Sequence, residues 1–213
     1  AVKKIADGCV SFERKGKVLS VEADKVLMAV GRKPNVEGYG LENTSIQYDQ
    51  RGIVVDDNML TNVNGVYAIG DVNARMMLAH AATMQGLHAV NHIIGESDVI
   101  DLNIMPAAIF TNPEAACVGK TEEQLKAEGV EVEVRKKNYR TNGRALAMAE
   151  AEGMIKLVAD ANSGAILSCH AYGSHSADIV QEISALMCRK TTLKQLHEMV
   201  HIHPTLNEML QEI

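Results

Sequence analysis

The chain has 213 residues, of which 46% are hydrophobic and 23% charged, so its composition is that of an ordinary globular protein with room for one or two domains. Its net charge of −6 and the lack of a basic run argue against nucleic acid as a partner. No apolar stretch of the sequence approaches the ~20 residues that a transmembrane helix needs.

Residues 1–35 are predicted to be extended. Residues 9–12 and 17–21 favour a β-hairpin around Lys15-Gly16. The mostly apolar run 25–30 ends at Gly31, which predicts a buried strand. A glycine that only ends a strand is as good an interpretation of Gly31 as a binding role.

Residues 36–104 contain turn clusters and two further strand-like runs, 52–55 and 65–69. Gly70-Asp71 follows the second run directly. A carboxylate at the end of a buried strand, beside a glycine that permits close approach, can accept hydrogen bonds from sugar-like hydroxyls. An isolated Gly-Asp pair is more often a plain turn, so the dipeptide alone does not decide its role.

A helix should follow this pair. The signals for its ends lie near Leu78 and at Gly95. Its one apolar face would carry Ala82, Ala89 and Ile93.

Residues 105–213 differ in character, because strand-like segments follow one another. These segments are 107–111, 130–136, 154–159 and 165–172. Helices are expected after the capping boxes Thr121-x-x-Gln124 and Thr192-x-x-Gln195. A longer helix over 177–190 would place Ile179, Ile183 and Leu186 on one stripe. The sequence therefore predicts an α+β domain around a mostly antiparallel sheet flanked by helices.

The C-terminal segment holds the best candidate for acid–base chemistry. His203 precedes Pro204, which favours an extended backbone before it and is a good first residue for a helix. Glu208 is close enough in sequence to reach back to the imidazole. A carboxylate beside an imidazole fixes its tautomer and raises its basicity, as a general base requires. Taken alone, the motif is better explained as the start of a surface helix.

Several further motifs, which follow one another in a consistent order, favour the acid–base role over a plain surface helix. The C-terminal His-x-His-Pro-Thr-Leu-x-Glu resembles the signature of the flavin-dependent pyridine nucleotide-disulfide oxidoreductases, most closely of the branch that reoxidises dihydrolipoyl groups with NAD. Further matching blocks are residues 30–35, 61–72, 77–82, 111–114, 118–122 and 143–145. The resemblance covers essentially the whole chain.

The resemblance implies FAD and NAD as cofactors of the full-length protein. Asp71 would hydrogen-bond the ribityl chain of FAD, and Gly31 would line the NAD site. The helix that faces the flavin would be opened by Met77, Leu78, Ala79 and His80. Its backbone amides and dipole would stabilise a reduced flavin, so the His80 side chain is better interpreted as structural.

The same resemblance gives the C-terminal pair its roles. His203 would be the acid–base and Glu208 its orienting partner, acting on the disulfide of the other subunit. The protein would be a homodimer that serves lipoyl domains of a 2-oxoacid dehydrogenase or glycine-cleavage complex. It would be cytoplasmic, or lie in the mitochondrial matrix of a eukaryote.

Two hallmarks of the family are absent from the sequence. There is no G-x-G-x-x-G, and the four cysteines are scattered, without the redox-active pair four residues apart. Such scattered cysteines favour a reducing compartment. We therefore expect the C-terminal portion of a longer enzyme, itself inactive. Residues 1–35 would be a remnant of the NAD domain, 36–104 a central FAD-contacting segment and 105–213 the interface domain.

Two alternatives stay open. His197-Glu198-x-x-His201 fits the H-E-x-x-H pattern of zinc metalloproteases, but Pro204 interrupts the helix that would carry such a site. We rank zinc well behind the flavoenzyme and expect no metal site. The second alternative is that the isolated chain is only a dimerisation module without catalysis.

Overall fold

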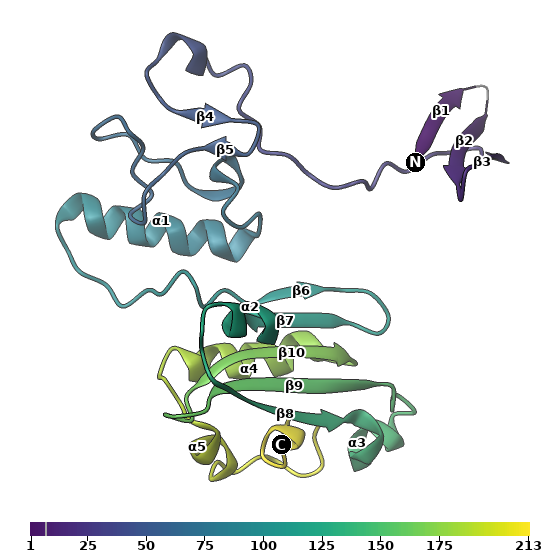
Figure 1. The fold of residues 1–213 in the computed structure, drawn as a ribbon, viewed down its shortest axis with the longest axis vertical. Helices are drawn as coiled ribbons and strands as arrows, with labels where there is room; N and C mark the ends of the chain where they lie inside the picture. The colour runs from purple at the N-terminus through teal and green to yellow at the C-terminus, as the bar shows by residue number, and fades with distance from the viewer. Residues whose placement is uncertain (7) are drawn as a thin grey trace.

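The computed structural model describes residues 1–6 and 8–213 (Figure 1). The chain begins with a three-stranded antiparallel meander of β1 (Val2–Ala6), β2 (Cys9–Arg14) and β3 (Lys17–Glu22). The predicted hairpin is confirmed, because Arg14 pairs with Lys17 across a two-residue turn. Lys15 and Gly16 have φ values of 51° and 74°. Positive φ at both central residues is typical of a type I′ hairpin turn.

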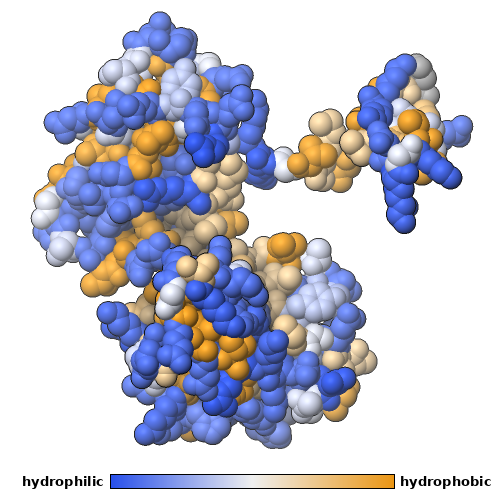
Figure 2. Space-filling model, viewed as in Figure 1, coloured by the Kyte–Doolittle hydropathy of each residue, from blue (hydrophilic) through white to orange (hydrophobic). Residues whose placement is uncertain are grey.

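The strand predicted for residues 25–30 is wrong. This segment has no regular secondary structure, and Leu27 and Val30 are 90% and 83% exposed. An apolar run becomes a buried strand only where neighbouring strands pair with its backbone groups, and no strand of the described residues does so here. Figure 2 shows hydrophobic residues along this extended connection between the meander and the rest of the molecule.

The middle of the chain is a small unit built on one long helix, α1 (Ala79–Ile94). The other elements are η1 (Leu41–Asn43), the short hairpin β4 (Tyr48–Asp49) and β5 (Gly52–Ile53), and the 3-10 turn η2 (Gly70–Asn73). The predicted helix is confirmed, and Gly95 caps its end with a φ of 74°. A left-handed residue at this position satisfies the last carbonyl groups of the helix.

Two details of this unit differ from the prediction. Residues 65–69 form no strand, because their pairing with residues 59–61 is limited to a single bridge between Leu60 and Tyr67. On α1, Ala82 is half-buried and Ile93, in the last turn, is 58% exposed. The buried residues of the helix are Ala81, Gln85 and Ala89.

Residues 105–213 fold around one five-stranded antiparallel sheet. Its strands, in spatial order, are β6 (Ala107–Ile109), β7 (Ala115–Gly119), β10 (Ile166–Gly173), β9 (Gly153–Asp160) and β8 (Val132–Asn138). The predicted α+β class is confirmed. The sequence predicts all of these strands except β7, whose Ala-Ala-Cys-Val-Gly run is poor in the β-branched and aromatic residues typical of strands.

Helices and turns surround the sheet. They are α2 (Glu122–Ala127), η3 (Tyr139–Thr141), α3 (Gly143–Ala147), α4 (Ser176–Met187), α5 (Leu193–His197) and η4 (Asn207–Leu210). Both predicted capping boxes are present, one at the start of α2 and one at the start of α5. Among the described residues, no helix combines the length and apolar character needed to cross a bilayer.

The main core lies between the sheet and α4. Ile179 and Ile183 are fully buried and Leu186 is partly buried, so the predicted stripe does face the sheet. The end of the chain joins the same core through Leu206, Met209 and Leu210. The segment that carries His203 therefore lies next to buried anchors on its C-terminal side.

Candidate active site

His203 and Glu208 are in direct contact. The Nδ1 atom of His203 lies 2.7 Å from Oε2 of Glu208. The imidazole is 81% exposed, whereas the Glu208 side chain is only 14% exposed. Because an ionised carboxylate only accepts hydrogen bonds, the neutral ring carries its proton on Nδ1 and keeps Nε2 as a proton acceptor. This is the geometry of an accessible base oriented by a sheltered carboxylate.

The backbone around this pair differs from the predicted helix start. No helix begins at Pro204; the next helical turn is η4, which begins at Asn207. The His203–Pro204 peptide bond is cis. Glu208 reaches His203 because Thr205 closes a turn, with its Oγ1 donating to the Ile202 carbonyl oxygen at 2.7 Å.

Asn142 holds the carboxylate of the pair from the opposite side, although nothing in the sequence analysis assigns it a role. Its Nδ2 donates to Glu208 Oε1 at 3.3 Å and to the Thr205 carbonyl oxygen at 3.0 Å. Its Oδ1 accepts from the Ala145 amide and thereby caps α3. Asparagine before a helix is a common cap, and that signal marks Asn142 in the sequence, but its second contact joins residues far apart in the chain.

A second imidazole–carboxylate pair lies beside the first. His201 Nε2 is 2.9 Å from Glu182 Oε1, and the side chain of His201 is only 6% exposed. The other oxygen of Glu182 accepts from Asn207 Nδ2 at 2.6 Å. Glu182 lies on α4, where the hydrophobic stripe in the sequence predicts only core residues.

The zinc-protease pattern is not arranged as such a site. Helix α5 ends at His197, so His197 and His201 do not lie one turn apart on a single helix. His201 is already paired with Glu182. Within residues 1–6 and 8–213, no group of three or more His, Cys, Asp or Glu side chains is placed to hold a metal ion. The geometry gives the zinc hypothesis no support.

The Gly70-Asp71 turn packs against the start of α1. Asp71 is exposed, at the first turn of η2. Gly70 has a φ of 73°, and a Cβ added to it would lie 3.1 Å from the Cβ of Ala82. No side chain caps the N-terminus of α1, so its first amides stay available for an outside acceptor. An exposed carboxylate and an uncapped helix start thus share one surface.

Buried amides fix this turn. Gln85 Oε1 accepts from the Gly70 backbone amide at 2.8 Å and from Asn73 Nδ2 at 2.9 Å. Asn73 Nδ2 also donates to the Ala68 carbonyl oxygen at 2.9 Å. Gln85 and Asn73 are 3% and 7% exposed. A glutamine on the inner face of a helix is the sequence signal for such a contact, because buried polar groups need partners.

The remaining predicted site residues lie either on this surface or on the extended segment that follows the N-terminal meander. Met77 and Leu78 are half-buried, and Ala79 and His80 are exposed. The His80 ring has a structural contact, with Nε2 2.7 Å from the Pro106 carbonyl oxygen. Gly31 lies on the extended segment and is exposed, with nothing within 4 Å of where its Cβ would be.

The His203 loop and the Asp71 turn do not meet within one chain. Figure 1 shows α1 near the β6 edge of the sheet and the C-terminus beside β8, at the opposite edge. The structure therefore forms two separate groups of predicted residues, His203 with Glu208 and Gly70-Asp71 with the start of α1.

Two family descriptions match the chain. The pyridine nucleotide-disulphide oxidoreductase dimerisation domain matches residues 105–213, and the pyridine nucleotide-disulphide oxidoreductase domain matches residues 1–86. The chain belongs to the pyridine nucleotide-disulphide oxidoreductase family.

Curated relatives and solved structures agree with this membership. Dihydrolipoyl dehydrogenase of Corynebacterium glutamicum is 40% identical over 95% of this chain and 45% of the relative. That of Bacillus subtilis is 39% identical over 99% of this chain and 45% of the relative. LpdA from Mycobacterium tuberculosis superposes with a TM-score of 0.87 at 27% identity, covering 100% of this chain and 46% of that one. The chain spans about half the length of the curated relatives that it matches.

Proposed function

We propose that this member of the pyridine nucleotide-disulphide oxidoreductase family is the acid–base and dimerisation portion of an FAD- and NAD-dependent dihydrolipoyl dehydrogenase. The observation that carries the proposal is the His203–Glu208 pair, an 81% exposed imidazole held at 2.7 Å by a sheltered carboxylate. The relatives named dihydrolipoyl dehydrogenase, at about 40% identity, support the substrate class.

In this proposal His203 removes the proton of a dihydrolipoyl thiol. A thiol has a pKa of ~8.5 and is largely protonated at neutral pH, although only the thiolate attacks a disulfide. Nε2 of His203 accepts that proton, and Glu208 at Nδ1 stabilises the imidazolium that results. Asn142 holds the Glu208 carboxylate in place through its other oxygen.

His203, rather than His201, is the proposed base. Both rings have a carboxylate partner, at 2.7 Å and 2.9 Å, so pairing does not distinguish them. Exposure does, since a ring that is 6% exposed cannot be reached by a substrate thiol without rearrangement.

The residues around Asp71 fit a flavin. FAD supplies the two-electron exchange between the thiol–disulfide couple and NAD. The exposed Asp71 carboxylate can accept hydrogen bonds from the ribityl hydroxyls. The uncapped start of α1 at Leu78, Ala79 and His80 presents backbone amides, and its dipole favours negative charge on the ring.

A second subunit, NAD and lipoyl domains are the proposed partners of this chain. His203 would act on the disulfide of a second subunit, which agrees with the separation of the His203 loop from the Asp71 turn within one chain. The match of residues 105–213 to a dimerisation domain supports a homodimer. Gly31 would line the NAD site, and lipoyl domains of a 2-oxoacid dehydrogenase or glycine-cleavage complex would deliver the thiol.

Substitution of the base tests the proposal in the holoenzyme that contains this chain. His203→Ala should lower lipoamide-dependent turnover ~10²–10⁴-fold, as loss of a general base does. Glu208→Ala should cost less, because the base itself remains. Flavin reduction by NADH should persist in both, since hydride transfer needs no proton from this pair. Near-normal lipoamide turnover in His203→Ala, with His201→Ala crippled instead, would show that the base is assigned to the wrong residue.

A further inference from the structure

One carboxylate on α4 binds both sides of the loop that carries His203. Oε1 of Glu182 is 2.9 Å from His201 Nε2, before the loop, and Oε2 is 2.6 Å from Asn207 Nδ2, after it. Glu182 makes no hydrogen bond with His203 itself among the described residues. Its two oxygens therefore fix the two ends of a short segment with the proposed base between them.

We call these two hydrogen bonds of Glu182, to His201 and to Asn207, the clamp. Glu182 itself lies on a rigid part of the fold. On either side of Glu182, Ile179, Val180 and Ile183 of α4 are at most 1% exposed. On the loop side, His201 is buried, and its Nδ1 lies 3.3 Å from the Met199 carbonyl oxygen. A carboxylate on a packed helix holds the loop in a fixed position relative to the core. Such support keeps a base within about 0.5 Å of its productive geometry.

We propose that Glu182 is a positioning residue for His203, and that it acts by holding His201 and Asn207 together. The inference rests on the proposed function, because it presumes that His203 is the base. Glu182 neither exchanges a proton with the substrate nor touches it. It keeps the loop folded so that His203 Nδ1 stays on Glu208 and Nε2 stays presented to the substrate.

The chemistry explains why the position holds a carboxylate. Both groups that face Glu182 donate hydrogen bonds, an imidazole N–H and an amide N–H. An ionised carboxylate accepts from both at once, whereas an amide has only one oxygen that accepts and an NH₂ group that donates. Glutamine has almost the same shape as glutamate but turns its own NH₂ towards one of the two donors. Glu182→Gln therefore tests the clamp with little change in packing.

The first arm of the test uses the 213-residue chain and observes the His203 ring by nitrogen-detected NMR. Glu182→Gln and Glu182→Ala should change the ring signals of His203 and release the hydrogen bond to Glu208, while circular dichroism stays native. Gln181→Ala is the matched control, because Gln181 is the exposed neighbour on the same helix and makes no side-chain hydrogen bond in the described part of the chain. Unchanged His203 signals in the folded Glu182→Gln chain would overturn the proposal.

The second arm measures the holoenzyme. Glu182→Ala should lower kcat with lipoamide by up to ~10²-fold, the loss that a misplacement of about 1 Å can cause, with KM nearly constant and flavin reduction by NADH unaffected. Glu182→Asp should restore part of kcat, since it retains two acceptors. A role in stability alone would lower the melting temperature and leave kcat of the folded enzyme unchanged, which would also refute the positioning role. Failure of the proposed function is a separate result: His203→Ala would then remain active while the NMR effect of Glu182→Gln persisted.

Discussion

At the scale of single residues, burial separates groups that look equivalent in the sequence. His201 and His203 are two positions apart and both have a carboxylate partner, yet one side chain is 6% and the other 81% exposed. The cysteines show the same contrast. All four are free, with Cys169 fully buried in the sheet core and Cys188 exposed at the end of α4.

This contrast predicts selective thiol chemistry. Burial raises the pKa of Cys169 to about 12, so only about one ten-thousandth of it is thiolate at a pH of about 8. Iodoacetamide should therefore label Cys188 in the folded chain and leave Cys169 unmodified until the protein is unfolded. Peptide mass spectrometry over a labelling time course measures both. Labelling of Cys169 at the rate of Cys188 without unfolding would contradict the prediction.

At the scale of elements, the ends of several helices follow from capping residues in the local sequence. The two capping boxes start α2 and α5, and Gly95 ends α1. The two elements that differ from the prediction both depend on whether a distant strand pairs with them. The run 25–30 is apolar enough for a strand but has no neighbour, and β7 is a strand because β6 and β10 pair with it.

One packing contact predicts a large loss of stability. A methyl group placed on Gly173, at the end of β10, would lie 2.6 Å from Cζ of Tyr139, and the φ of 143° suits only glycine. Tyr139 is fully buried, and its hydroxyl donates to the Ser174 carbonyl oxygen at 2.8 Å. Gly173→Ala should lower the free energy of unfolding by at least ~2 kcal/mol, as overpacking and backbone strain do together.

A second glycine provides the control. Gly143 opens α3 and has open space where its Cβ would be, without a positive φ. Gly143→Ala should be neutral or raise the free energy of unfolding by up to ~1 kcal/mol, because alanine restricts the unfolded chain. Urea denaturation of both variants measures the difference. Equal stability of the two would show that the ring of Tyr139 moves aside without cost.

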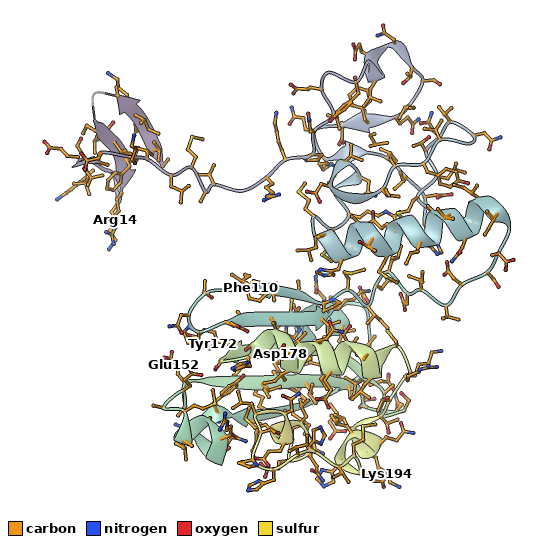
Figure 3. All side chains as sticks on the ribbon, turned by 180° about the vertical axis from the view of Figure 1, so that it is seen from behind. Arg14, Phe110, Glu152, Tyr172, Asp178 and Lys194 are labelled. Carbon is orange, nitrogen blue, oxygen red and sulfur yellow. The ribbon has the colours of Figure 1, made fainter. Side chains whose placement is uncertain are left out.

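At the scale of the whole molecule, the β6 edge of the sheet carries large apolar side chains that are exposed in the single chain. β6 is an edge strand, and Ile109 and Phe110 at its end are 65% and 79% exposed. Figure 3 shows Phe110 at this edge. An edge strand that ends in exposed, large apolar side chains is a site of association.

We expect the chain to be a homodimer that uses this edge. Light scattering at micromolar concentration should give about twice the chain mass of 23.1 kDa. Phe110→Glu should shift the mass towards the monomer, because a charge would be buried at the contact. Val18→Glu should not, because Val18 lies on the separate meander, where it is 67% exposed. A monomeric wild-type chain would rule out this dimer, and a dimeric Phe110→Glu variant would place the contact elsewhere.

Cofactor binding also depends on the whole molecule. The sequence has no Gly-rich loop for the pyrophosphate of a dinucleotide, and Asp71 with the start of α1 contacts only part of a flavin. The purified chain should therefore be colourless and fail to reduce NAD with dihydrolipoamide. Visible absorbance and a coupled NAD assay measure both properties. Stoichiometric flavin in the chain purified by itself would disprove the prediction.

The sequence by itself determined the α+β class, most of the strands, the starts of α1, α2, α4 and α5, and the candidate pair His203 and Glu208. These follow from periodicity, capping residues and ordered motifs, all of which act over short distances along the chain. Tertiary structure alone decided which imidazole is accessible, that Asn142 holds Glu208, and that Glu182 spans the His203 loop. Those contacts join residues on separate elements, and a side-chain hydrogen bond over such a separation leaves no local pattern in the sequence from which it could be predicted.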